Sequence, residues 1–153
     1  MDVEPRSTWR LWVRMGLGLI WIAGAFFNLV WTLRQPNVFG QGGFAGEAGL
    51  TIYRWFFREV IAPAPTFWTV LLVLGEAALG AQTLAKGAWA RAGLWGSALW
   101  SLWLFPLMWP YTIMMGPFAL VPLWLLRGTQ DVSAIDLLRR RAHRPGAARP
   151  GHA

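Results

Sequence analysis

The chain has 153 residues, of which 56% are hydrophobic and 14% are charged, and it carries a formal net charge of +7 at pH 7. This length suits one compact unit, and the apolar residues fall in long runs, which indicates a membrane protein rather than a soluble core. The lack of cysteine excludes disulfides, thiol chemistry and iron–sulfur clusters held by this chain; both histidines, His143 and His152, lie in a polar tail, which excludes a metal site built on histidines within the membrane.

The first apolar run covers residues 9–33 and is interrupted only by Arg10, Arg14 and Asn28. A helix of about 20 residues spans about 30 Å of hydrocarbon, so this run predicts a first membrane span. No small-residue cleavage site follows it, so we expect a retained helix rather than a signal peptide. Arg14, Trp21 and Asn28 are seven residues apart and share one helical face, which we expect to meet the second span.

Residues 50–61 form a shorter segment that has its apolar and charged side chains on different sides of a helix. Tyr53 and Phe57 recur at helical spacing on one side, and Arg54 and Arg58 lie one turn apart on another. The segment is too short and too charged to span a bilayer, so it predicts an interfacial helix on the membrane surface. The two arginines could receive an anionic substrate, because guanidinium groups match oxyanions, or they could meet lipid phosphates.

The second span is predicted over residues 67–84, and it carries one carboxylate, Glu76, at its middle. A central acidic residue costs about 3 kcal/mol on insertion scales, so it is expected to have a partner or a use. Glu76 could bind a ligand or pass a proton. It could equally form a structural ion pair or a hydrogen bond between helices, with Arg14, Asn28 or Arg91 as the partner.

The third and fourth spans are predicted over residues 92–109 and 111–126. Gly93, Ser97 and Ser101 repeat every four residues in the third span and form a face of small residues on which another helix can pack. The predicted fold is therefore an all-α integral membrane four-helix bundle with one interfacial helix between spans 1 and 2. Residues 1–127 form this domain, and residues 128–153 form a basic, partly disordered tail.

Basic residues predict the orientation of the chain. Of the 14 basic residues, those between the first two spans are only Arg34, Arg54 and Arg58. The excess on the other side places both termini in the cytoplasm of a multi-pass protein of the inner (plasma) membrane. The positive charge is thus a topology signal, and no nucleic-acid partner is expected. Many of the 12 tryptophans lie near the ends of the apolar runs, as in interfacial belts, although they could also simply fill helix surfaces.

Several segments occur in an order that resembles a known family. They are the Arg14–Gly24 stretch that opens the first span, Tyr53–Pro65 in the surface helix, the Gly75–Gly80 core with its Gly-Glu pair, and Arg91 after a short turn. This order resembles the DoxX/DoxD-like family of small four-helix membrane proteins, over roughly residues 9–126.

The resemblance implies a membrane subunit linked to quinone-dependent electron transfer, since some relatives are subunits of a thiosulfate:quinone oxidoreductase. Thiosulfate or a similar sulfur oxyanion would dock at Arg54 and Arg58, and Glu76 would exchange a proton with the quinone. Asn28 stands near the position where the family often has a lysine. The residues expected around the quinone are Arg14, Trp21, Asn28, Arg91, Trp100 and Trp103.

Two other functions remain open. The chain could be a non-catalytic subunit that anchors or assembles a partner of a redox complex, because it has no redox ligands of its own and ends in a basic tail. It could also be a small proton or solute transporter with Glu76 in its path, although no internal repeat of hydropathy indicates one. In every case we expect no covalently bound cofactor and extensive contact with membrane lipids.

Overall fold

The computed structural model describes residues 5–35, 38, 44–106, 115–129 and 131–142. This part of the chain forms helices and turns without any strand, which confirms the all-α prediction for it. The elements in chain order are α1 (Pro5–Val30), the 3₁₀-helix η1 (Thr32–Arg34), α2 (Phe44–Glu47), α3 (Thr51–Phe56), the π-helix η3 (Phe57–Ile61), α4 (Pro65–Leu84), α5 (Ala88–Leu104), α6 (Met115–Leu125) and α7 (Ala134–Ala142).

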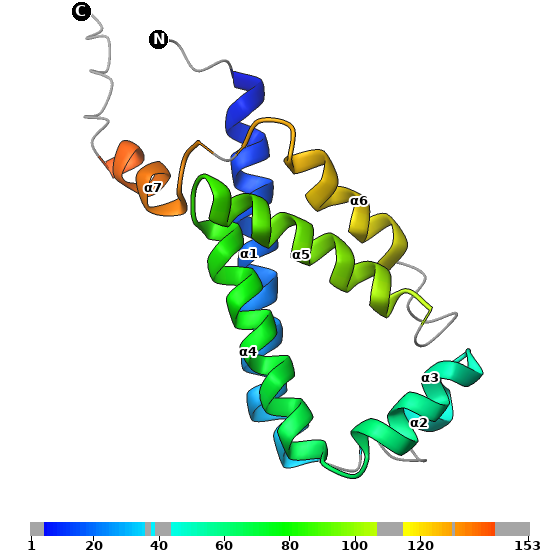
Figure 1. Cartoon of the computed structure of the whole chain (residues 1–153). Helices are drawn as coiled ribbons and strands as arrows, with labels where there is room; N and C mark the ends of the chain where they lie inside the picture. The colour runs from blue at the N-terminus through cyan, green and yellow to red at the C-terminus, as the bar shows by residue number, and fades with distance from the viewer. Residues whose placement is uncertain (1–4, 36–37, 39–43, 107–114, 130, 143–153) are drawn as a thin grey trace, which may run out of the picture.

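The helices form two antiparallel pairs, as Figure 1 shows. α1 and α4 run side by side over most of their length. α5 leaves the end of α4 at a wide angle after a turn in which Gly87 has a φ of +64°, a conformation that glycine adopts without strain. α6 accompanies α5, and α2 and α3 lie near the end of α5 that is far from α4. The segment that leads into α7 is hydrogen-bonded to Arg14 in the amino-terminal half of α1.

Two stretches are long and apolar enough to cross a membrane, Trp9–Arg34 and Pro65–Leu84. The share of their most apolar windows that is buried within the protein is only 28% and 22%, whereas a core helix of a soluble protein would be mostly buried. Large apolar side chains such as Phe26 and Leu74 are more than half exposed. An apolar surface of this kind is favourable in lipid and unfavourable in water.

The other two predicted spans are shorter where they are described. α5 has 17 residues and α6 has 11, against the roughly 20 that a perpendicular span requires. Residues 107–114, which include the end of the third predicted span and the start of the fourth, lie outside the described residues, as does the tail from residue 143 that was expected to be disordered.

Glycines set the contact between α1 and α4. A Cβ atom on Gly80 would lie 2.6 Å from Cγ1 of Ile22 and 2.8 Å from the carbonyl oxygen of Gly18. A Cβ atom on Gly18 would in turn lie 2.7 Å from Cγ of Leu84. The contact of Gly80 with the Gly18 backbone is so close that a larger residue at position 80 would require a shift of a helix, a packing mode that is also used in membrane helix pairs with small residues at the crossing.

The contact between α4 and α5 follows the small-residue face predicted for the third span. A Cβ atom on Gly93 would lie 2.5 Å from the backbone nitrogen of Thr83, so α5 passes directly over the end of α4. Ser97 and Ser101 are fully buried, and their hydroxyls donate to the carbonyls of Gly93 (2.7 Å) and Ser97 (2.8 Å). The buried hydroxyls are thus satisfied within their own helix.

The surface segment has the two-sided character that its sequence predicts. Tyr53, Phe57 and Ile61 are buried, whereas Arg54 and Arg58 are exposed. The segment also packs against α4 and α5. The ring of Phe56 lies 6.3 Å from that of Trp68 in α4 and 5.9 Å from that of Trp103 in α5. This aromatic cluster connects the start of α4 with the end of α5.

We predict that Gly80→Leu separates α1 from α4. The new side chain would overlap Ile22 and the Gly18 backbone, and overpacking of this kind costs about 1–3 kcal/mol. Thermal unfolding of the purified protein in detergent measures the loss. Gly75→Leu is the matched control in the same helix, because the described structure leaves open space at its Cβ position. Equal unfolding temperatures for the two variants would contradict the close contact.

Candidate functional site

Glu76 lies between α1 and α4 and has an exposed fraction of 8%. Its Oε2 atom accepts a hydrogen bond of 2.8 Å from the side-chain amide of Asn28, and the Asn28 carbonyl oxygen accepts one of 2.7 Å from the Thr32 hydroxyl. Gly24 leaves room for the carboxylate, since a Cβ atom there would lie 3.4 Å from Oε2. Of the partners considered from the sequence, Asn28 is the one that this carboxylate meets.

Within the described residues, the ion pairs join Arg58 to Glu59 and Lys86 to Asp136, and neither involves Glu76. Arg14 precedes Gly24 by ten residues, or about 15 Å along a helix axis. The Glu76 carboxylate is therefore held by a hydrogen-bond chain of neutral groups rather than by a neighbouring cation.

Arg14 is almost completely buried, with an exposed fraction of 1%, and its partners lie far along the chain. Its two terminal nitrogens donate to the backbone carbonyls of Thr129 and Val132, in the segment between α6 and α7. Arg10, one turn earlier, donates to the carbonyl of Arg127 at 3.1 Å. Both arginines thus hold the chain that follows α6 against the start of α1.

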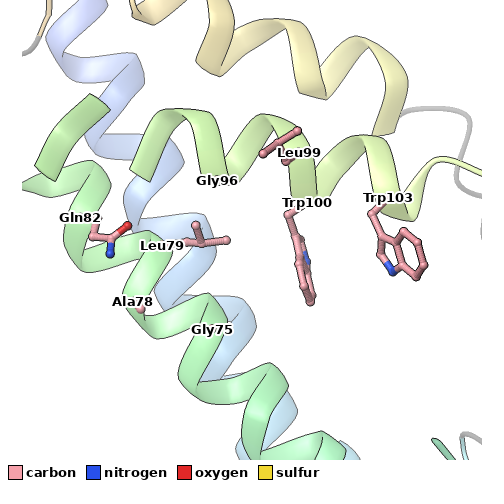
Figure 2. A pocket seen from close by; sticks show the side chains of 8 residues that line it. All are labelled: Gly75, Ala78, Leu79, Gln82, Gly96, Leu99, Trp100 and Trp103. Carbon is pink, nitrogen blue, oxygen red and sulfur yellow. The ribbon is translucent and has the colours of Figure 1, made fainter. Parts of the chain in front are cut away.

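A pocket of about 430 Å³ lies between α4 and α5. In Figure 2, two indole rings extend from α5 toward α4, and the floor has no side chain at Gly75 and Gly96. The indole nitrogen of Trp100 is buried and has no hydrogen-bond partner in the described structure. The residues that line the pocket are Gly75, Ala78, Leu79, Gln82, Gly96, Leu99, Trp100 and Trp103.

The surface segment reaches this pocket through Tyr53. Its hydroxyl donates a hydrogen bond of 2.9 Å to the backbone carbonyl of Trp103, and the two rings lie 5.0 Å apart. Burial raises the pKa of the Tyr53 hydroxyl above its usual value, so the group remains a donor at neutral pH. Tyr53 therefore fixes the end of α5 that carries one wall of the pocket.

The residues that the sequence suggested for a quinone site do not meet at one place. Trp100 and Trp103 line the pocket, whereas Trp21 packs in the core with its ring 6.4 Å from Phe118. Arg91 is exposed near the start of α5. Arg14 is bonded to the segment between α6 and α7, and the Asn28–Glu76 pair lies between α1 and α4. For the proposed oxyanion site, Arg54 and Arg58 are both exposed, and Arg58 already pairs with Glu59 at 2.6 Å.

Sequence reasoning missed Gln82, Gly75 and Gly96 as pocket residues. Their spacing carries a signal in retrospect, because Gly75 and Gln82 are seven apart and share one face of α4, about a quarter of a turn away from Glu76. The same described residues contain no group of three or more His, Cys, Asp or Glu side chains that could hold a metal ion.

Comparisons of the chain with family models, curated proteins and solved structures found no match.

We predict that Asn28→Leu destabilises the protein by about 1–3 kcal/mol, because the buried Glu76 carboxylate loses its amide donor. In a Glu76→Met background the same change should cost much less, since the group that needs the donor is gone. Denaturant unfolding of the four proteins gives this double-mutant cycle. Identical costs in both backgrounds would show that the Asn28–Glu76 hydrogen bond contributes no coupling.

Proposed function

We propose that this chain is a DoxX-like multi-pass membrane subunit that binds a quinone between α4 and α5 and is linked to electron transfer. The observation that carries the proposal is the pocket walled by Trp100 and Trp103. Its volume lies within the range of small-molecule sites, and its lining is mostly apolar and aromatic. Leu99 and Trp103 are exposed, so the pocket is open to a ligand dissolved in the surrounding lipid.

The lining suits a planar ring with carbonyl oxygens. The flat faces of Trp100 and Trp103 can pack against such a ring. The Gln82 amide is a polar group of the lining that can donate a hydrogen bond to a carbonyl oxygen. The open space at the Cβ position of Gly75 leaves room on the α4 side of the pocket.

When bound, a quinone would supply the capacity to accept two electrons from the oxyanion donor and two protons that come from water. We assign to Glu76 the holding or release of a proton close to the pocket, since it follows Gly75 directly in α4 and is linked to Asn28 and Thr32. We assign to Arg54 and Arg58 the binding of thiosulfate or a similar sulfur oxyanion. Both are exposed on the surface segment that Tyr53 joins to the pocket wall.

The membrane arrangement is part of the same proposal. α1 and α4 would form two spans, and the spans predicted over residues 92–109 and 111–126 would be the other two. The distribution of basic residues along the chain favours cytoplasmic termini and the inner membrane.

A non-catalytic role as an anchoring or assembly subunit is the second candidate. It is favoured by the position of the Glu76 carboxylate, which is hydrogen-bonded to Asn28 and is not among the residues that line the pocket. In this case Glu76 would serve the pairing of α1 with α4, and a partner protein would carry the redox chemistry.

We predict that Gly75→Leu blocks quinone binding, because Gly75 lines the pocket and the structure leaves open space at its Cβ position, into which the new side chain would extend. Titration with a water-soluble short-chain ubiquinone, followed by quenching of tryptophan fluorescence, should show a Kd at least about tenfold weaker. Gly16→Leu is the matched control, since Gly16 of α1 also has open space and lies outside the pocket. Equal quenching of both variants and the unchanged protein would overturn the quinone site.

We predict further that Glu76→Gln slows thiosulfate-dependent reduction of the quinone by the purified protein by about 100-fold, the lower range for loss of an acid–base group. Glu47→Gln, at an exposed carboxylate in α2, is the control. Equal rates for Glu76→Gln and the unchanged protein would remove Glu76 from the chemistry. An inactive chain beside a partner subunit that is active alone would favour the anchoring role.

A further inference from the structure

One ion pair joins the carboxy-terminal helix α7 to the turn after α4. Ser133 caps it: its hydroxyl accepts a hydrogen bond of 3.1 Å from the Asp136 backbone nitrogen and donates one of 2.8 Å to the Asp136 carboxylate. The bonds from Ser133 hold the pKa of the Asp136 carboxyl below its usual range, so the group is ionised at neutral pH. An Asp136 carboxylate oxygen lies 3.9 Å from the Nζ atom of Lys86, in the turn between α4 and α5.

The segment just before α7 is fixed as well. Arg14 donates to the carbonyls of Thr129 and Val132, and Arg10 donates to that of Arg127. These bonds come from α1, whereas Lys86 approaches from the turn after α4. The segment that leads into α7 and the first turn of α7 are therefore held by groups from two separate parts of the fold.

The other side of α7 is apolar and uncovered. Ile135 and Leu138 are three residues apart on one face, and their exposed fractions are 62% and 53%. Arg139, one turn after Ile135, is exposed, and Arg140 and Arg141 follow it in the same helix. A short helix with two exposed aliphatic side chains beside a run of three arginines has the character of an interfacial membrane helix.

The surroundings of α7 contain other groups typical of a membrane boundary. The exposed tryptophans Trp9 and Trp12 belong to the same end of α1, and Trp89 follows the turn that holds Lys86. Arg10 lies over the Trp124 ring with its Cζ atom 4.8 Å from the ring centroid. Tryptophan and arginine side chains gather where headgroups meet acyl chains.

We propose that α7 binds the surface of an anionic bilayer, with Ile135 and Leu138 inserted at the boundary between headgroups and acyl chains and Arg139 against lipid phosphates. The charge of the helix selects the occupant, because a basic apolar face suits anionic phospholipid better than a neutral bilayer. The inference needs the membrane insertion proposed above but is independent of the quinone site, so failure of quinone binding leaves it standing.

The chain has no cysteine, so a single reporter can be placed on α7 in the full-length protein. Leu138→Cys, labelled with the environment-sensitive fluorophore NBD, is compared in nanodiscs of phosphatidylcholine and of phosphatidylcholine mixed with phosphatidylglycerol. We expect a shift to shorter wavelength and protection from aqueous iodide in the anionic discs. Asp131→Cys, at an exposed position before α7, is the matched control and should report water in both.

Charge variants complete the test. Arg139→Gln in the labelled protein should lower the equilibrium constant for insertion of the probe by about fivefold, the amount expected for one basic residue near an anionic surface. A probe at residue 138 that iodide reaches equally in both discs would overturn the proposal. So would equal protection in neutral discs, or protection that appears only when two chains share a disc, which would assign the face to a second copy. Circular dichroism of each variant verifies that the helices are retained.

Discussion

The close approach of α1 and α4 at Gly18 and Gly80 is the constraint on which the rest of the structure depends. Helices in lipid gain little from burying apolar surface against each other, so the association relies on van der Waals contact and on hydrogen bonds between helices. Absence of a side chain at these two positions allows the backbones to come together. The same register brings Asn28 of α1 opposite Glu76 of α4, at 2.8 Å.

Several buried polar groups in this apolar fold have hydrogen-bond partners that tie one element to another or to its own preceding turn. Glu76 receives the Asn28 amide, Arg14 donates to two backbone carbonyls, and the serines of α5 donate to carbonyls one turn earlier. An unpaired polar group in a low-dielectric setting costs several times more than a typical hydrogen bond contributes, so these pairings limit how the helices can be arranged. They also explain how one acidic residue is accommodated in the middle of α4 without a cation beside it.

The separation of the carboxylate from the pocket shapes the functional interpretation. α4 presents one face to α1, with Glu76, and another to α5, with Gly75 and Gln82. A proton on Glu76 and a quinone ring between Trp100 and Trp103 would therefore lie on different sides of α4. The surface segment joins this arrangement from outside, because the Tyr53 hydroxyl fixes the end of α5 near the pocket wall.

The sequence by itself determined that the chain is helical, where the two long apolar helices lie, and on which side of the surface segment the charged residues are exposed. Tyr53 and Phe57 are buried and Arg54 is exposed, as the helical period requires, and Gly93 and Ser97 form a packed face. Such features depend on periodicity within one segment, and residues a few positions apart are enough to reveal them.

Only the tertiary structure decided which residues from different helices come into contact. Asn28 and Glu76 are 48 residues apart in sequence, and the Arg14 guanidinium bonds carbonyls in the segment between α6 and α7. The pocket exists because α5 leaves α4 at a wide angle. Crossing angles and axial register follow from where backbones can approach and where buried polar groups find partners. Those are properties of pairs of helices, and the periodicity of a single helix does not contain them.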